Sequence, residues 1–221
     1  MAHPAPRPSA SVSRRRKEAR PGELIAAALD LFVEKGFAAT RLDDVAARAG
    51  VSKGTVYLYF PSKEDLFKQV VQTGIVPVLE EGAALLDQHR GSAAELLRAL
   101  LFGWWERIGA TRLAGIPKLM MSEAGNFPDL AAFYYEAVIR RGRGLLAEIL
   151  RRGVEAGEFR LVDPETAVDV IIAPPLMLAV WRHSFATCCP GASVNAVAFI
   201  ETHIDLLLNG LRKRPATEIR S

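Results

Sequence analysis

The sequence has almost no cysteine, and its only two thiols are neighbours in the chain. Cys188 and Cys189 are the two cysteines among 221 residues. Adjacent cysteines resist an unstrained disulfide, so no disulfide framework is expected, which is typical of the reducing cytosol. Two interpretations stay open: idle or packed thiols, which the lack of closely flanking basic residues favours, and a paired redox switch.

Long hydrophobic runs are also missing. The longest, from Val170 to Trp181, has twelve residues and contains two prolines, whereas a membrane-spanning helix needs about 20 apolar residues. Residues 1–13 have no continuous apolar segment of the kind that a signal peptide carries. We therefore expect a cytoplasmic protein without a membrane partner.

The spacings of common catalytic and metal sites do not occur in the sequence. The four histidines are scattered, without HExxH or paired-cysteine patterns. There is no phosphate-binding glycine loop and no GxSxG segment. Gly142 and Gly144 lie in a helical pattern, whereas a dinucleotide fingerprint follows a strand. We expect no enzyme activity, no metal ion and no cofactor.

What the sequence does have is helical periodicity and an uneven charge. Half of the residues are hydrophobic, and they recur at helical spacing, with strand-like alternation nearly absent. Residues 1–70 hold 12 Lys and Arg against 8 Asp and Glu, while residues 71–221 hold 16 against 17. Because basic side chains neutralise phosphates, this asymmetry favours a nucleic-acid partner for the first part of the chain.

The segment from Thr40 to Leu66, TRLDDVAARAGVSKGTVYLYFPSKEDL, predicts two short helices and the start of a third. We expect Thr40 to cap the first helix, with Asp43 as its reciprocal partner, and Gly50 to end it in a left-handed conformation. Ser52 is the expected cap of the second helix. That helix is about 10 Å long, which suits a recognition helix in the DNA major groove.

The run from Ala27 to Phe67, AALDLFVEKGFAATRLDDVAARAGVSKGTVYLYFPSKEDLF, resembles the DNA-binding domain of the TetR family of bacterial transcriptional regulators, of the AcrR-like kind. The phrase SEAGNFPDLAAFYYEAV, from Ser122 to Val138, is similar to one in regulatory domains of some of these repressors. The resemblance implies an all-α protein. With it we expect a disordered basic arm (1–19), then a three-helix helix-turn-helix DNA-binding domain (20–67), and last a helical ligand-binding and dimerisation domain (68–212).

Periodic segments locate the individual helices. The first is expected from Pro21 to Lys35, and the fourth begins after a Ser62 cap, with a kink or break near Pro77. Further helices are expected over residues 92–108, 113–124, 128–154, 164–187 and 193–211. The basic run at residues 14–17 has two readings, a solvated tail or an arm on phosphates or in a minor groove.

A recognition helix buries one side and offers the other to DNA. The expected core anchors are Val51, Val56 and Phe60. Gly54 lets the backbone approach the bases, and lysine, threonine and tyrosine side chains can contact base edges or phosphates. Leu58 departs from the family pattern, which more often has a polar or aromatic residue there. The residues expected to contact DNA are Thr40, Ser52, Lys53, Gly54, Thr55, Tyr57, Tyr59 and Lys63.

Aromatic and methionine side chains are frequent in the helices of the second domain. Methionine adapts its shape and aromatic rings present broad faces, so together they suit a pocket for a small apolar or aromatic effector. Ordinary core packing is the alternative for each of them. The candidate pocket residues are Trp104, Trp105, Met120, Met121, Phe127, Tyr134 and Trp181.

The resemblance implies a homodimer that forms through the last two helices, over residues 165–187 and 193–211. The expected seam consists of Val168, Ile171, Ile172, Leu176, Val180, Val197, Ile200, Ile204 and Leu208. Two heads related by two-fold symmetry suit a palindromic operator. We therefore expect a transcriptional repressor that a small-molecule effector releases from DNA. The alternatives are an activator or an effector-independent regulator, and a helical small-molecule-binding protein or enzyme.

Overall fold

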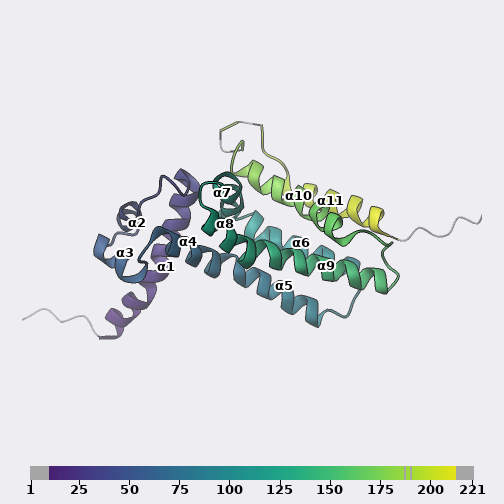
Figure 1. Ribbon diagram of the computed structural model, residues 1–221, viewed down its shortest axis with the longest axis horizontal. Coiled ribbons are helices and arrows are strands. Elements are labelled where there is room, and N and C mark those ends of the chain that lie inside the picture. The colour runs from purple at the N-terminus through teal and green to yellow at the C-terminus, as the bar shows by residue number, and fades with distance from the viewer. Residues whose placement is uncertain (1–9, 187, 190, 213–221) are drawn as a thin grey trace, which may run out of the picture. The chain divides into compact units, whose positions relative to one another are not determined.

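The computed structural model describes residues 10–186, 188–189 and 191–212, with side chains from residue 21 onward. Every regular element within these ranges is a helix, and one isolated antiparallel bridge joins Phe159 to Arg212. The prediction of an all-α protein is confirmed. The chain divides into two compact units, Met1–Val70 and Val71–Ser221, whose helices are labelled in Figure 1.

The first unit is built around three phenylalanines. Its helices are α1 (Ala10–Lys35), α2 (Leu42–Arg48), α3 (Lys53–Tyr59) and the start of α4 (Lys63–Gly74). Phe32, Phe37 and Phe67 are buried, and their ring centroids lie 5.5 to 5.6 Å apart. Aromatic rings attract one another at this spacing, so the cluster joins α1, the turn after it and α4 into a base for α2 and α3.

Helix α1 begins at Ala10 rather than at the expected Pro21, which lies inside it. The segment from Ala10 to Arg20 is rich in arginine, lysine, glutamate and alanine, which are good helix formers. Proline removes one intrahelical hydrogen bond, and the helix continues through it. The expected disordered arm overlaps this helix over residues 10–19, and residues 1–9 lie outside the described residues.

Two glycines in the left-handed region end the first two helices. Gly36 has φ of 83° after α1, and Gly50 has φ of 66° after α2, where a Cβ would be strained. The prediction for Gly50 is confirmed. The predicted cap of α4 is also present, because the hydroxyl of Ser62 accepts from the backbone N–H of Asp65 at 3.0 Å and donates to its carboxylate at 2.6 Å.

Thr40 does not cap α2, so that prediction was wrong. The residue before α2 is Arg41, and no side chain caps the helix. The Thr40 hydroxyl lies 2.7 Å from the carbonyl oxygen of Gly36 and 3.2 Å from that of Leu31. The last carbonyls of a helix lack partners within it. Thr40 therefore completes the end of α1 instead of the start of α2.

The second unit is a bundle of longer helices with two π-helical segments, η1 and η3. Its elements are α5 (Val76–Gln88), α6 (Ala93–Trp104), η1 (Trp105–Gly109), the 3-10 turn η2 (Arg112–Ala114), α7 (Gly115–Glu123), α8 (Pro128–Tyr134), η3 (Tyr135–Ile139), α9 (Arg140–Glu155), α10 (Pro164–Arg182) and α11 (Ala196–Leu211). The core lies mainly between α6, α9, α10 and α11, where Leu97, Ile149 and Ile200 are fully buried. The expected break near Pro77 falls at Ile75, between α4 and α5.

The middle of α10 is held by a histidine from α11. Pro174 and Pro175 lie inside α10, and a proline leaves the carbonyl four residues earlier without its helix donor. For Pro175 that carbonyl belongs to Ile171, and it lies 3.1 Å from Nε2 of His203. Because a carbonyl only accepts, Nε2 carries the proton. His203 thus replaces the bond that the proline removes and ties α11 to α10.

Helix α10 has 19 residues, and its length and apolar composition would fit a membrane span. Of its apolar 18-residue stretch, 28% is buried inside the protein. It is longer than the twelve-residue apolar run considered above. One side packs in the core through Val168 and Ile171, while Val170 and Met177 are exposed. A single such helix is weak evidence for a membrane, because a core helix passes the same test. An exposed apolar strip also fits a protein partner.

Candidate nucleic-acid interface and internal cavity

Helix α3 has a buried side and an exposed side. Val56 and Phe60 are buried as predicted, whereas Val51 is only half-buried. The hydroxyl of Ser52 accepts from the backbone N–H of Thr55 at 3.2 Å, which confirms the predicted cap. The exposed side carries the polar residues, and Leu58 projects there with 77% of its surface exposed. A helix that satisfies its core with two anchors leaves its other side free for a partner.

Lys53 is the cation on this exposed side. Its Nζ lies 2.9 Å from Oδ2 of Asp43 on α2 and 5.8 Å from the ring centroid of Tyr57. The hydrogen bond to Asp43 raises the pKa of Lys53, so the side chain is charged at neutral pH. Both side chains of the pair are more than half exposed, and exposed pairs of this kind are weak. Lys53 can therefore exchange Asp43 for another anion at little cost.

Gly54 faces open space. A Cβ at this position would meet only the Ser52 hydroxyl, at 3.9 Å. The backbone of Gly54 is not in the left-handed region, so the fold itself gives no reason for glycine here. Glycine at position 54 would, however, let a partner molecule approach the backbone closely.

The other expected DNA contacts differ in availability. Thr40 is 2% exposed, so its side chain is not presented to a partner. The ammonium of Lys63 donates to the carbonyl oxygen of Phe37 at 2.7 Å and lies 4.4 Å from the centroid of its ring. Tyr59 is half-buried beside Phe60. The structure thus places Ser52, Lys53, Gly54 and Tyr57 on the exposed side of α3, with Thr55 half-buried among them.

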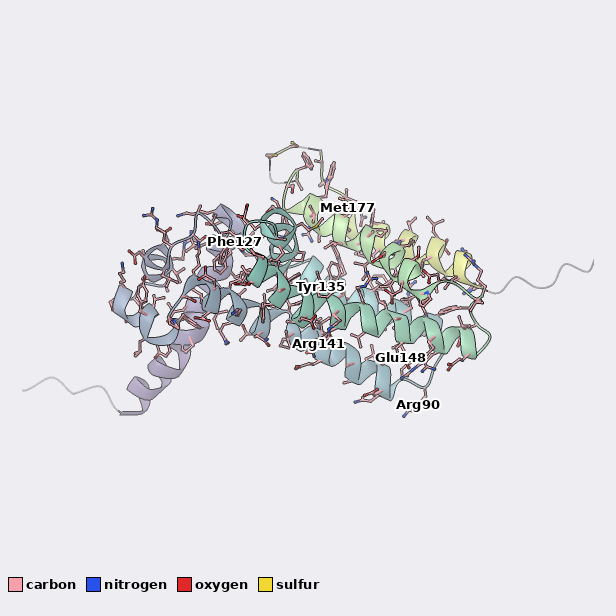
Figure 2. The ribbon with its side chains drawn as sticks, viewed as in Figure 1. Arg90, Phe127, Tyr135, Arg141, Glu148 and Met177 are labelled. Atoms are coloured by element: carbon pink, nitrogen blue, oxygen red, sulfur yellow. The ribbon has the colours of Figure 1, made fainter. Side chains whose placement is uncertain are left out.

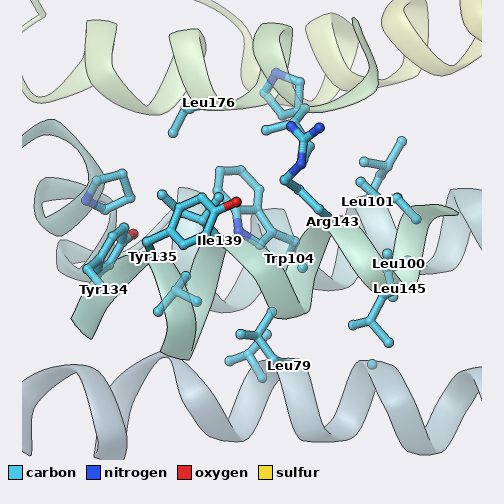
Figure 3. Close-up of a pocket in the computed structure, with 18 of the residues that line it drawn as sticks. Leu79, Leu100, Leu101, Trp104, Tyr134, Tyr135, Ile139, Arg143, Leu145 and Leu176 are labelled. Atoms are coloured by element: carbon cyan, nitrogen blue, oxygen red, sulfur yellow. The ribbon is translucent and has the colours of Figure 1, made fainter. Parts of the chain in front are cut away.

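The second unit contains a partly open cavity of about 940 Å³, within the range of small-molecule sites. Its walls come from α5 to α10, and most of the lining side chains are apolar (Figure 3). Both π-helical segments contribute, η1 through Arg107 and η3 through Tyr135 and Ile139. In each segment a backbone N–H bonds to a carbonyl five residues back, at Ala110 and at Arg140. Such segments are frequent at functional sites.

Four of the seven expected pocket residues line this cavity: Trp104, Met120, Met121 and Tyr134. The other three, Trp105, Phe127 and Trp181, do not line it. Trp105 is buried in the core beneath the guanidinium of Arg182. Trp181 donates from Nε1 to the carbonyl of Ala192 at 2.7 Å and packs against Phe185. Trp181 is exposed and Phe127 is half-buried, so residue type alone does not separate pocket, core and surface.

Sequence reasoning missed much of the lining. Leu79, Leu100 and Leu145 come from α5, α6 and α9, and Figure 3 shows them around the same space as Trp104. Leucines at helical spacing signal a core face, and nothing in their pattern separates a filled core from a hollow one. Tyr135 was overlooked beside Tyr134 because adjacent positions normally face different ways on an α-helix.

The charged side chains that line the cavity are paired. Arg107 lies 2.5 Å from Glu81, and Arg143 lies 3.0 Å from Glu165 and also contacts Asp169. The hydrogen bonds to Asp169 and Glu165 raise the pKa of Arg143. Glu136, the remaining charged lining residue, bonds to an arginine on its own helical run. The arginines of the lining are therefore neutralised by the protein itself.

The last two helices expose an apolar strip that differs from the predicted seam. Val168, Ile171, Ile200 and Ile204 are fully buried in the core of their own unit, so they are not available to a second chain. Ile172 and Leu176 line the cavity. The exposed apolar residues on these helices are Val170, Met177, Trp181, Val197 and Leu206, and Figure 2 places Met177 on α10. Of the predicted seam, Val197 is exposed as expected and Val180 and Leu208 are half-buried, while the other six residues lie in the core or line the cavity.

Cys188 and Cys189 are free and exposed. Their sulfur atoms lie 3.4 Å apart, well beyond the disulfide bond length of about 2.05 Å. The hydrogen bond with Cys188 raises the pKa of the Cys189 thiol. A higher pKa means less thiolate at neutral pH and lower reactivity. Among the described residues no group of three or more His, Cys, Asp and Glu side chains could hold a metal ion.

Two family descriptions match the chain. "Bacterial regulatory proteins, tetR family" matches residues 24–70, and "Tetracyclin repressor-like, C-terminal domain" matches residues 87–187. An uncharacterized HTH-type transcriptional regulator, YfiR of Bacillus subtilis, is 31% identical over 165 residues, which are 71% of this chain and 76% of that protein. The HTH-type transcriptional repressor KstR2 of Mycolicibacterium smegmatis is 29% identical over 74% of this chain and 75% of its own.

Solved structures share the fold. The fatty acid degradation regulator FadR from Bacillus halodurans has a TM-score of 0.74 and 24% identity, covering 88% of this chain and 97% of that one. FadR from Bacillus subtilis, solved in complex with stearoyl-CoA, has a TM-score of 0.73 and 21% identity, covering 86% and 98%.

Proposed function

The chain belongs to the tetR family of bacterial regulatory proteins, and from that premise we propose that it is a cytoplasmic, homodimeric transcriptional repressor that a small-molecule effector releases from a palindromic operator. The observation that carries the DNA-binding part is the exposed side of α3. Lys53 and Tyr57 project there, and Gly54 leaves the backbone uncovered. Lysine donates to guanine or phosphate, and a bare backbone permits close approach to base edges.

The contacts proposed for α3 come from Ser52, Lys53, Gly54, Thr55 and Tyr57, with Tyr59 and Lys63 at the edge. Ser52 lies at the start of α3, where free backbone N–H groups suit a phosphate. Lys63 reaches DNA only if it gives up its carbonyl partners. For Thr40 we propose a positioning role, since its hydroxyl fixes the end of α1.

The cavity is the proposed effector site. Its volume of about 940 Å³ and its apolar lining suit a molecule of drug or lipid size. A relative of the same fold was solved with stearoyl-CoA, which supports a lipophilic effector here. The effector releases DNA only to the extent that it binds the DNA-incompetent arrangement more tightly than the competent one.

The proposed dimer forms through the exposed apolar faces of α10 and α11. Val170, Met177 and Leu206 are each more than half exposed, and a face of this kind is rarely left in water. Two copies related by a two-fold axis would cover it and present two α3 helices to two half-sites.

The test is binding of the purified full-length protein to duplex DNA from the region flanking its own gene, followed by fluorescence anisotropy over a salt series. We expect tight binding to one palindromic fragment that weakens steeply with salt, and loss of that preference in Lys53→Ala. Equal, weak binding to all fragments would count against a local operator. An operator-driven reporter separates repression from the alternative, activation, by the direction in which the protein changes transcription.

A further inference from the structure

The cavity of the second unit contains a polar side chain that the fold leaves without a partner. Tyr134 is 6% exposed, and its hydroxyl makes no hydrogen bond within the described part of the chain. No fully buried side-chain nitrogen or oxygen in that part lacks a partner. The Tyr134 hydroxyl is therefore not sealed among protein atoms, and the space that this residue lines is the cavity.

The Tyr134 hydroxyl is available as a donor. Burial raises the pKa of Tyr134 above its ordinary value, so the phenol keeps its proton across the physiological range. A lipophile that fills the cavity displaces water from this hydroxyl, and a donor left without an acceptor is unfavourable. A molecule that fills the cavity would therefore gain most if it placed an acceptor oxygen at this hydroxyl.

The charges around the cavity disfavour an enclosed anion. Arg107 is paired with Glu81, and Arg143 is shared by two carboxylates, those of Glu165 and Asp169. A carboxylate brought inside would lose its hydration and would compete with two carboxylates for Arg143, whose side chain is only 26% exposed. Arg107 and Glu81 are both about half exposed, so their pairing is weaker. An uncharged group loses far less on leaving water.

The shape of the cavity sets the length of the occupant. Tyr134 and Leu145 both line it from one helical run, which covers about 16 Å between them. Figure 3 shows Tyr134 and Tyr135 toward one end, and Leu100 and Leu145 toward the other. One end therefore offers phenol hydroxyls, and the other offers leucine side chains.

We propose that Tyr134 donates a hydrogen bond to a carbonyl or similar acceptor oxygen of the effector, and that the enclosed part of the effector is an uncharged lipophile. Its apolar end lies among the leucines. This inference rests on the proposed function, because it names the class of molecule that the effector site takes. Tyr135 is not required in the same way, because it is 49% exposed and water can satisfy its hydroxyl.

The test compares two twelve-carbon probes, 2-dodecanone and dodecanoate, on the full-length protein at pH 7.5. Trp104 lines the cavity, so intrinsic tryptophan fluorescence follows binding. We expect the ketone to bind at least about tenfold more tightly than the carboxylate. Tyr134→Phe keeps the ring and should weaken ketone binding about three- to tenfold. Tyr135→Phe removes the neighbouring, half-exposed hydroxyl and should weaken ketone binding less than Tyr134→Phe does.

Three results would overturn the assignment: dodecanoate binding as tightly as the ketone, unchanged ketone affinity in Tyr134→Phe, or no ketone binding at all. Operator binding, measured on the same preparation, distinguishes failure of the Tyr134 assignment from failure of the proposed repressor function. If DNA is bound and dodecanoate releases it better, the repressor stands and the Tyr134 assignment fails. If ketone binding depends on Tyr134 but no DNA is bound, the assignment stands and the repressor fails.

Discussion

Asp43 holds the ammonium of Lys53 at 2.9 Å. The lysine belongs to the exposed side of α3 and the carboxylate to α2, so an anion lies beside the cation that is proposed to meet DNA. In the proposed complex Lys53 leaves this partner to reach a base or a phosphate, and the carboxylate would repel the DNA backbone. We therefore expect Asp43 to oppose indiscriminate binding while it positions Lys53.

Replacing Asp43 by Asn should strengthen binding to any duplex. The variant frees Lys53 and removes a negative charge, so we expect affinity about two- to fivefold higher at low salt, with a steeper salt dependence. Anisotropy with operator and unrelated DNA measures both. Asp44→Asn is the control, because it removes the same charge one position along, from a pair with Lys35. An equal gain in both variants would show that net charge, rather than release of Lys53, is the cause.

Gly54→Ala should separate stability from DNA binding. The new methyl group meets only the Ser52 hydroxyl at 3.9 Å, and alanine is the better helix former, so the protein should be unchanged or more stable by up to about 1 kcal/mol. Operator affinity should fall, since the methyl group stands where the bases approach. Thermal unfolding and anisotropy are measured on one preparation. Unchanged operator affinity would contradict a close backbone approach at this position.

Thr40→Val should destabilise the protein by about 1 to 3 kcal/mol, because it leaves the Gly36 carbonyl, 2.7 Å from the Thr40 hydroxyl, without its donor. Thr40→Ser keeps the hydroxyl and should retain most of the stability. Urea unfolding gives both values. If serine were no better than valine, the hydroxyl would not be what Thr40 contributes.

His203 should make stability depend on pH. Partial burial lowers the pKa of His203, so the folded protein holds this proton less tightly than the unfolded chain. The contribution of His203 to the free energy of unfolding is therefore complete above the pKa of the unfolded chain, about 6.5. It is lost as the pH falls toward the lower pKa of His203 in the folded protein. In His203→Gln the free energy of unfolding, measured by urea titration, should differ less between pH 8 and pH 5.5 than in the unaltered protein. His203→Leu should cost about 1 to 3 kcal/mol at pH 8, since the Ile171 carbonyl loses its donor.

A glutamate at Leu206 should prevent dimerisation without unfolding the chain. Leu206 is 67% exposed on α11, so the fold tolerates the charge, whereas a closed apolar interface does not. Sedimentation should show a monomer, and operator affinity should fall with it. Glu201→Gln, on the same helix, is a surface control. A dimeric Leu206→Glu protein with normal circular dichroism would place the interface elsewhere.

The helices and their order could be predicted from the sequence, because periodicity and caps such as Ser52 and Ser62 are local signals. The role of Thr40 could not, since its hydroxyl serves the helix before it rather than the one after it. The exposed apolar side of α10 could not be predicted either: Ile171 is buried and Val170 is exposed. An apolar residue on α10 can lie in the core, at the cavity or at the surface. Only the packing of α9 and α11 against α10 decides which.

The two π-helical segments determine which residues of the later helices face the cavity. A π turn contains an additional residue, and one residue turns an α-helix by roughly 100°. The side chains after Ile139 are therefore out of phase with those of α8. Tyr134, before this segment, and Leu145, after it, both line the cavity. Shortening η3 by one residue would rotate α9 and point a different set of side chains inward. Ligand specificity could therefore change at once through a one-residue deletion, as well as gradually through side-chain substitutions.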